Sequence, residues 1–250
     1  MKLNTINLTL QGKGGVGKSY ITTILAQYLK DYKGIEISGA DTDPVNRSFA
    51  GIKKLNALPV DIIENDAISQ AKFDSIFELM LTDDNSTFII DNGASTFLPF
   101  TKYIKDNGVI EMFEEAQKEV FIHTVIVGGQ SQNDTLQGLL TLFDLIKDSN
   151  NVKLVIWLNE FQGKITDADK IFKAVAKKTA SFVVVENKNS DAFTADLEKL
   201  TKNRLTLKEA LESADFNLMA KQRLKRVFND IYVQLDQIYD NAENTAVLEA

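Results

Sequence analysis

Short apolar runs of strand length alternate with amphipathic stretches of helical length along most of this chain. Runs rich in β-branched and aromatic residues predict strands over residues 3–10, 35–38, 59–63, 87–91, 120–127, 153–158 and 181–185. Apolar positions at helical spacing predict helices over 19–32, 73–81, 109–118, 134–147 and 167–178, and one or two more between 191 and 239. Because strands that alternate with helices form parallel sheets, we expect an α/β fold: a doubly wound, mainly parallel sheet of about seven strands flanked by helices.

Length and composition favour one domain. The 250 residues are 44% hydrophobic, which is enough for a single large core. We therefore expect residues 1–250 to form one domain, with a C-terminal helical segment at about 191–240.

A glycine-rich loop connects the first predicted strand to the first predicted helix. It matches G-x-x-x-x-G-K-[ST], and its members are Gly12, Lys13, Gly14, Gly15, Val16, Gly17, Lys18 and Ser19. In such a phosphate-binding loop (P-loop), backbone N–H groups surround the phosphates, Lys18 reaches the β and γ oxygens, and Ser19 ligates Mg²⁺. The sequence therefore predicts a site for ATP and Mg²⁺, a P-loop NTPase fold, and a nucleotide-binding set that extends to Tyr20.

Two other predicted strands end in carboxylates. Residues 88–91 form a buried-looking strand that ends at Asp91, in the manner of a Walker B element that holds Mg²⁺ through water. Asp41, Thr42, Asp43 and Pro44 follow the second predicted strand. The alternative for Asp91 is an aspartate that caps the turn after its strand. The alternative for Asp41 to Pro44 is a plain Asp-Pro turn.

A second lysine in the loop, Lys13, indicates a particular class of P-loop protein. With the Asp41–Pro44 motif, the loop resembles those of the deviant Walker A ATPases, the ParA/MinD-type proteins. The resemblance implies that Lys13 contacts the nucleotide of a partner subunit in an ATP-dependent homodimer. It also implies that Asp43 positions the attacking water and that Asp41 lies in the outer shell of the Mg²⁺. The alternative for Lys13 is a solvated loop lysine.

A set of motifs in a fixed order resembles the TraL/StbB-type proteins, deviant Walker A ATPases of conjugative plasmids. These motifs are 11–19, 41–46, 90–95, 123–125 with 128–130, and 157–159. The resemblance implies a role in plasmid transfer or stability, with a plasmid transfer protein or a DNA-bound protein as partner. The run Asp91-Asn92-Gly93-Ala94-Ser95 departs from the Asp-Thr-Pro-Pro that is usual in the wider family, so the loop that follows can behave differently.

The loop 128–134 and Asn159 are further candidates for the site, whereas His123 and Trp157 are not. The loop 128–134 precedes a helix that Asn133 or Asp134 would cap, and its polar side chains either reach the nucleotide or form a plain turn. Asn159 follows an apolar run and would lie against the purine. His123 and Trp157 stand inside apolar strands and are expected in the core.

Charge and composition limit the partners and the location. The net charge is −7, and residues 196–250 hold 8 basic against 10 acidic residues, so direct DNA binding is expected to be weak or to require a dimer. An apolar stripe over 224–238 could contact a membrane or DNA, but packing on the sheet is favoured. The absence of cysteine excludes cysteine-ligated metal centres. With no signal segment or transmembrane segment predicted, the expected location is the cytoplasm.

Three functions fit these observations. The first is a slow, dimerising ATPase switch in which Lys13, Lys18 and Asp43 are catalytic, and Ser19, Asp41 and Asp91 hold the metal. The second is a nucleotide-gated adaptor with negligible hydrolysis. The third, a small-molecule kinase, has no evident use for an intermolecular lysine.

Overall fold

Seven parallel strands form the central sheet. A computed structural model describes the chain apart from residues 1–3, 65–66, 189 and 249–250. The strands run in the order β3-β2-β6-β1-β7-β8-β9. Their bounds are Leu58–Pro59 (β3), Ile37–Asp41 (β2), Thr87–Asp91 (β6), Thr5–Thr9 (β1), Glu119–Val127 (β7), Val152–Asn159 (β8) and Thr179–Val185 (β9). Every neighbouring pair is parallel, so the expected fold class is confirmed.

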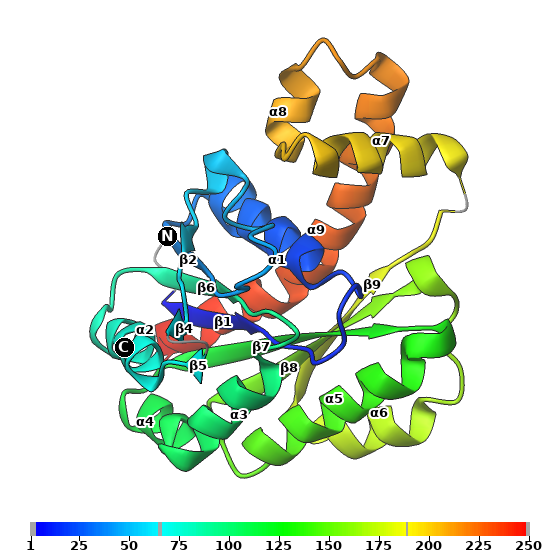
Figure 1. Ribbon diagram of the computed structural model, residues 1–250. Helices are drawn as coiled ribbons and strands as arrows, with labels where there is room; N and C mark the ends of the chain where they lie inside the picture. The colour runs from blue at the N-terminus through cyan, green and yellow to red at the C-terminus, as the bar shows by residue number, and fades with distance from the viewer. Residues whose placement is uncertain (1–3, 65–66, 189, 249–250) are drawn as a thin grey trace.

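Helices cover both faces of the sheet (Figure 1). One face carries α1 (Lys18–Gln27) and α9 (Leu218–Leu248), and α7 (Asp191–Lys202) and α8 (Leu207–Glu212) pack against α9. The other carries α2 (Gln70–Thr82), α3 (Phe97–Asp106), α4 (Val109–Glu115), α5 (Gln132–Ile146) and α6 (Asp169–Val175). Strand residues alternate between the two cores, because successive side chains point to opposite faces. Phe121 and Val125 face α1 and α9, whereas Ile122 and Ile126 face the other layer.

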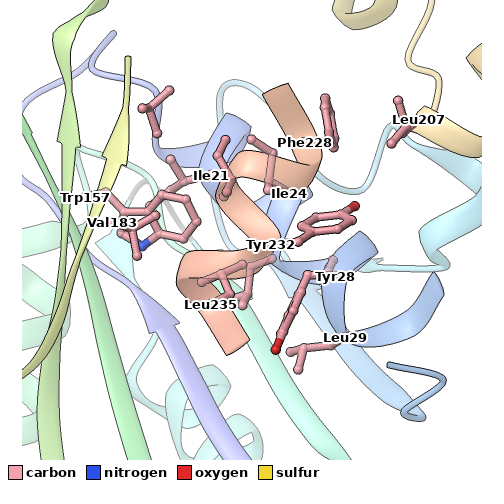
Figure 2. Close-up of a cluster of buried hydrophobic side chains, with 14 of the residues drawn as sticks. Ile21, Ile24, Tyr28, Leu29, Trp157, Val183, Leu207, Phe228, Tyr232 and Leu235 are labelled. Carbon is pink, nitrogen blue, oxygen red and sulfur yellow. The ribbon is translucent and has the colours of Figure 1, made fainter. Parts of the chain in front are cut away.

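The long C-terminal helix α9 packs beside α1 on the same face of the sheet, against β9. Figure 2 shows Tyr232 and Leu235 of α9 near Tyr28, which directly follows α1, with Trp157 and Val183 of the sheet in the same cluster. The predicted apolar stripe, Leu224, Val227, Phe228, Ile231, Leu235 and Ile238, is buried throughout. Packing on the sheet is therefore confirmed, and this stripe is not available to a membrane or to DNA. Within the described residues, no helix is both long enough and apolar enough to cross a membrane.

A polar cluster lies inside this core. Trp157 Nε1 donates to His123 Nδ1 at 3.0 Å, and His123 Nε2 lies 3.2 Å from Asn7 Oδ1. The Tyr239 hydroxyl of α9 donates to the same Asn7 oxygen at 2.6 Å. Burial lowers the pKa of His123 to about 3, so the ring is neutral and both of its nitrogens have partners. The prediction that His123 and Trp157 are core residues is confirmed.

Several predicted elements were wrong. The strand expected over 59–63 is only the two-residue β3, and a separate antiparallel pair follows it, β4 (Ile63–Glu64) with β5 (Ala67–Ile68). Helix α3 was not predicted. The region 191–239 holds three helices instead of one or two. Helix α5 begins at Gln132 after a 3₁₀ turn (η3, Gly129–Ser131), so neither Asn133 nor Asp134 is its N-cap.

The remaining short turns lie at helix ends and in loops. Helix α1 continues as a π-helical turn (η1, Tyr28–Tyr32), and 3₁₀ turns occur at η2 (Lys53–Leu55), η4 (Glu160–Gln162) and η5 (Ala176–Lys178). Of these, η4 bears on the site because it directly follows β8.

Candidate nucleotide-binding site

The strand register brings the predicted motifs to one edge of the sheet. Thr9, at the end of β1, is paired with Asp91, and Asp91 is paired with Asp41 of β2. The end of β8 lies beyond β7 on the other side of β1. Because all these strands are parallel, their carboxyl ends surround the loop that follows β1.

The loop has the backbone conformation that its glycines allow. Gly15 and Gly17 have φ values of +73° and +100°, which L side chains rarely adopt. A Cβ atom on Gly17 would also lie 3.0 Å from Asn159 Nδ2, and one on Gly12 would lie 2.9 Å from the Phe97 ring. Larger residues would therefore strain or displace the loop.

The loop leads into the amino end of α1. Gly17 is the N-cap of that helix; it offers no side-chain cap, and the first turn holds no acidic residue. The N–H groups and the positive end of the helix dipole therefore favour an anion at this point.

Lys18 curves back over the loop. Its Nζ donates to the Lys13 carbonyl oxygen at 3.0 Å, and the residue is buried. Burial lowers its pKa, while the carboxylates of Asp91 and Asp43 oppose that shift. The Lys18 ammonium group therefore lies between the P-loop backbone and the carboxylates of Asp91 and Asp43. That position suits a lysine that contacts phosphate oxygens.

Asp91, like Asp41, is a buried acid of the site. The Thr22 hydroxyl, on the inner face of α1, donates to its Oδ1 at 2.9 Å. Burial raises the pKa of Asp91 to about 7, against the opposing effects of the Ser19 and Thr22 hydroxyls. Its other oxygen, Oδ2, is buried without a hydrogen-bond partner among the described residues.

These residues fit a magnesium ion. A buried carboxylate oxygen without a donor is stabilised by a cation or by the water bound to one, and the Ser19 hydroxyl interacts with the same carboxyl group. No three His, Cys, Asp or Glu side chains within the described ranges gather into a complete metal site. Proteins usually hold Mg²⁺ through one or two carboxylates, water and phosphate oxygens of the substrate.

Asp41 and Asp43 organise the loop after β2. Asp41 is fully buried and accepts hydrogen bonds from the backbone amides of Phe49, Ala50 and Asp43, at 3.0 to 3.1 Å. Burial raises its pKa, while these amides lower it. Asp43 Oδ1 accepts hydrogen bonds from the backbone amides of Val45 and Asn46, at 2.9 and 3.1 Å. Asp41 therefore has a structural role in this loop, and its place in the outer shell of the Mg²⁺ stays a prediction. Asp43 is half-exposed at the site.

Lys13 has a different partner from Lys18 and lies at the surface. Its Nζ pairs with Asp134 Oδ2 at 2.8 Å, and 39% of its side chain is exposed. Asp134 lies in the first turn of α5. The two lysines of one loop therefore face different surroundings: Lys18 is enclosed, and Lys13 is at the surface.

The loop is also tied to the segment after β8. Asn159 Nδ2 donates to the Val16 carbonyl at 3.0 Å, and Gln162 Nε2 donates to the Gly15 carbonyl at 2.9 Å. A mainly apolar cavity of about 270 Å³ opens beside these contacts. It is lined by Gly15, Val16, Gly17, Tyr20, Asn159, Phe161, Gln162, Val185, Glu186, Phe193, Thr194, Leu197, Glu198, Thr201 and Val227. Tyr20 and Asn159 both border this cavity, at one end of the P-loop.

The structure thus brings all the predicted site residues to a single edge, but sequence reasoning missed three contacts. Thr22 could have been found as a polar position on the apolar face of its helix. Gln162 and the role of Gln11 had no local signal, because each bonds to a segment distant in the chain.

Fold and loop together define the class: this is a P-loop nucleotide-binding protein. The chain belongs to the CobQ/CobB/MinD/ParA nucleotide binding domain family, whose model matches residues 8–233.

Two curated relatives, both called Protein TraL and both from Escherichia coli, are similar over nearly their full length. One is 37% identical over 237 residues, covering 92% of this chain and 97% of the relative. The other is 35% identical over 249 residues, covering 97% and 99%. The resemblance to TraL-type proteins is therefore confirmed. Among solved structures, a ParA family ATPase from Chlorobium tepidum TLS has the same fold, with a TM-score of 0.50 and 15% identity, covering 90% of this chain and 98% of that one.

Proposed function

We propose that this protein is a slow ATPase switch that binds ATP with Mg²⁺ and then closes face to face on a second copy of itself. One observation carries the proposal: Lys18 is enclosed by its own P-loop, whereas Lys13 of the same loop pairs with Asp134 at the surface and is partly exposed. One lysine suffices for the β and γ phosphates of the bound nucleotide. Lys13 is then positioned to serve the nucleotide of the opposite subunit.

The surface around the loop supports a second copy as the partner. Val45, two residues after Asp43, is 75% exposed, and Leu98, next to the Phe97 that touches Gly12, is 68% exposed. Apolar side chains beside a highly polar site suit burial against another protein surface. Two facing triphosphates also carry many like charges, so each needs a cation from the opposing chain before the faces can close.

Nucleotide binding is assigned to the P-loop, with Tyr20 and Asn159 beside the base. The apolar cavity next to Gly15–Gly17 suits a flat aromatic base, because base-sized ligands are held mainly by apolar walls with a few polar groups. Ser19, Asp41 and Asp91 form the proposed metal set, and Mg²⁺ would neutralise charge on the phosphates. Asp43, half-exposed near Lys18, is the proposed group that positions the attacking water.

We place this activity in plasmid transfer or plasmid stability, with a plasmid transfer protein or a DNA-bound protein as the downstream partner. The similarity to Protein TraL over nearly the whole chain supports that placement. The cytoplasmic location and the single-domain organisation expected from the sequence stay predictions. A nucleotide-gated adaptor with negligible hydrolysis is the alternative, since the fully bonded Asp41 shows that part of the acidic motif serves the loop itself.

Two variants test nucleotide binding and hydrolysis separately. Lys18→Ala should abolish ATP binding in calorimetry, whereas Lys102→Ala, which changes an exposed lysine of α3, should not alter it. Wild-type affinity in the first variant would refute the site.

Asp43→Asn keeps an oxygen for the two loop amides but removes the negative charge. It should bind ATP normally and hydrolyse it about 100-fold more slowly. An unchanged rate would rule out Asp43 as the residue that positions water. Nucleotide-dependent dimers with no measurable wild-type hydrolysis would favour the adaptor.

A further inference from the structure

We infer that Asp134 is a latch on Lys13: it holds the lysine in its own subunit and so sets the threshold for ATP-dependent closure. This inference rests on the proposed function, because it concerns the regulation of the same site. The direct observation is the ion pair between Lys13 Nζ and Asp134 Oδ2, 2.8 Å apart. An ammonium that pairs with a carboxylate of its own chain must leave it before it can reach a phosphate of another chain.

The first turn of α5 is fixed against the start of the P-loop, so this pairing has a defined geometry. Gln11, directly before the loop, is fully buried. Its Nε2 donates to the Thr135 carbonyl at 3.1 Å and to the Val125 carbonyl at 3.0 Å. Gly138 provides the space, since a Cβ atom there would lie 2.2 Å from Gln11 Oε1. The residue after Asp134 is thus bonded to the residue before Gly12, and Asp134 is held within reach of Lys13.

A second set of contacts holds the same turn from the β8 side. Gln132 exchanges two hydrogen bonds with the backbone of Thr166, in the segment that leaves β8. Gly128 approaches Gly163 so closely that a Cβ atom would lie 2.3 Å from the Gly163 carbonyl oxygen. Since Gln162 also contacts the P-loop, one connected set of hydrogen bonds positions the loop, the turn and Asp134 together.

The strength of the latch suits a reversible control. Both partners are partly exposed, 39% for Lys13 and 59% for Asp134, so solvent screens the pair and it can open without large cost. Each closed dimer must open two such latches. Loss of a weak exposed pair changes an equilibrium by roughly threefold to fivefold, and two of them by about ten- to twenty-five-fold. Asp134 acts through Lys13 and is therefore a positioning residue.

The test is the dimer dissociation constant of the full chain with ATP and Mg²⁺, measured by sedimentation for wild type, Asp134→Asn and Asp144→Asn. Asp144 is the matched control, because it pairs with Lys147 at 2.7 Å near the far end of α5 with similar exposure. We expect Asp134→Asn to dimerise about ten- to twenty-five-fold more tightly, and Asp144→Asn to match wild type. The gain should shrink at high salt, which screens the wild-type pair. An unchanged or weaker dimer in Asp134→Asn would overturn the latch.

A nucleotide-free measurement separates this inference from the proposed function. The acylation rate of each lysine can be followed by mass spectrometry in the monomer. Asp134→Asn should speed modification of Lys13 several-fold and leave Lys102 unchanged. An unaltered Lys13 rate would show that the pair does not restrain the lysine, whether or not dimers form. A faster Lys13 rate without any ATP-dependent dimer in any variant would leave the restraint standing but remove the proposed function and, with it, the latch's regulatory role.

Discussion

The Asn159 side-chain amide donates a hydrogen bond to the Val16 carbonyl oxygen, 3.0 Å away, and joins the end of β8 to the middle of the P-loop. The contact is buried, and the Asn159 oxygen accepts from the Phe161 amide in turn. One residue therefore supports both the loop and the turn that borders the apolar cavity. Its position predicts a role in loop geometry as well as in contact with the base.

Asn159→Ala should weaken nucleotide binding about tenfold and lower the free energy of unfolding by about 1 kcal/mol, because the Val16 carbonyl and the Phe161 amide lose their partner. Calorimetry and urea denaturation measure the two effects. Asn229→Ala, on the exposed face of α9, is the control and should change neither. Wild-type affinity in Asn159→Ala would show that the loop keeps its shape without this contact.

Gly138→Ala should destabilise the protein, although alanine ordinarily favours a helix by about 1 kcal/mol. The added methyl group would meet Gln11 Oε1 at 2.2 Å and displace the side chain that joins α5 to the P-loop. We expect a loss of about 2 kcal/mol in urea denaturation, with weaker ATP binding. Gln137→Ala, exposed on the same helix, should be neutral or slightly stabilising. A Gly138→Ala protein as stable as wild type would contradict the close packing of Gln11.

His123 makes stability depend on pH. Its folded pKa is about 3 and its unfolded pKa is 6.5, so between these values the unfolded chain binds a proton that the folded chain does not. The contribution of His123 to the free energy of unfolding is complete above pH 6.5 and is lost as the pH falls towards 3. Asp91 has the opposite effect, because its folded pKa of about 7 exceeds the unfolded 3.8. The pH dependence of the wild-type free energy of unfolding therefore combines the opposite effects of His123 and Asp91.

The difference in unfolding free energy between wild type and His123→Gln isolates the histidine. It should decrease by about 2 kcal/mol from pH 6.5 to pH 5, in favour of the variant. Urea denaturation across that interval measures it. A difference that does not vary with pH would mean that the ring is protonated, or solvated, in the folded protein.

Direct DNA binding should be weak without nucleotide. Arg223 pairs with Asp196 at 2.7 Å, which leaves Lys221, Lys225 and Arg226 of the basic cluster on α9. Three cations correspond to a slope of about −3 for log affinity against log salt, and to weak non-specific binding. We expect no gel shift at physiological salt without ATP, and any shift that appears with ATP to be reduced by Lys225→Glu with Arg226→Glu. Strong binding by the nucleotide-free chain would point to direct DNA partitioning.

Helices and strands with a clear spacing of apolar residues were predictable from the sequence, and contacts between distant segments were not. The strand 87–91 was predicted with its observed bounds, because a run of apolar residues that ends in one carboxylate has few other interpretations. Helix α3 was missed because Pro99 follows Phe97 and Leu98 closely, so the segment reads as a turn. Proline is tolerated there because it lies in the first turn, where backbone N–H groups have no intrahelical partner.

The site was predictable as a set of motifs but not as a set of contacts. The P-loop and Asp43 follow strands, and Asp91 and Asn159 are the last residues of strands. The carboxyl ends of these strands must converge in a parallel sheet. The pair between Lys13 and Asp134 joins residues 121 positions apart, and nothing in either local sequence indicates it. The same holds for Gln11, whose partners lie on β7 and α5.

The central claim is that ATP brings two copies together through Lys13. Light scattering on the full chain, with and without ATP and Mg²⁺, tests it for wild type and for Lys13→Gln, which preserves length and removes charge. We predict a mass near that of one 27.9 kDa chain without nucleotide, roughly twice that mass for wild type with ATP, and a monomer that still binds ATP for Lys13→Gln. An ATP-dependent dimer of normal strength in Lys13→Gln, or a wild-type protein that stays monomeric with saturating ATP, would contradict the account.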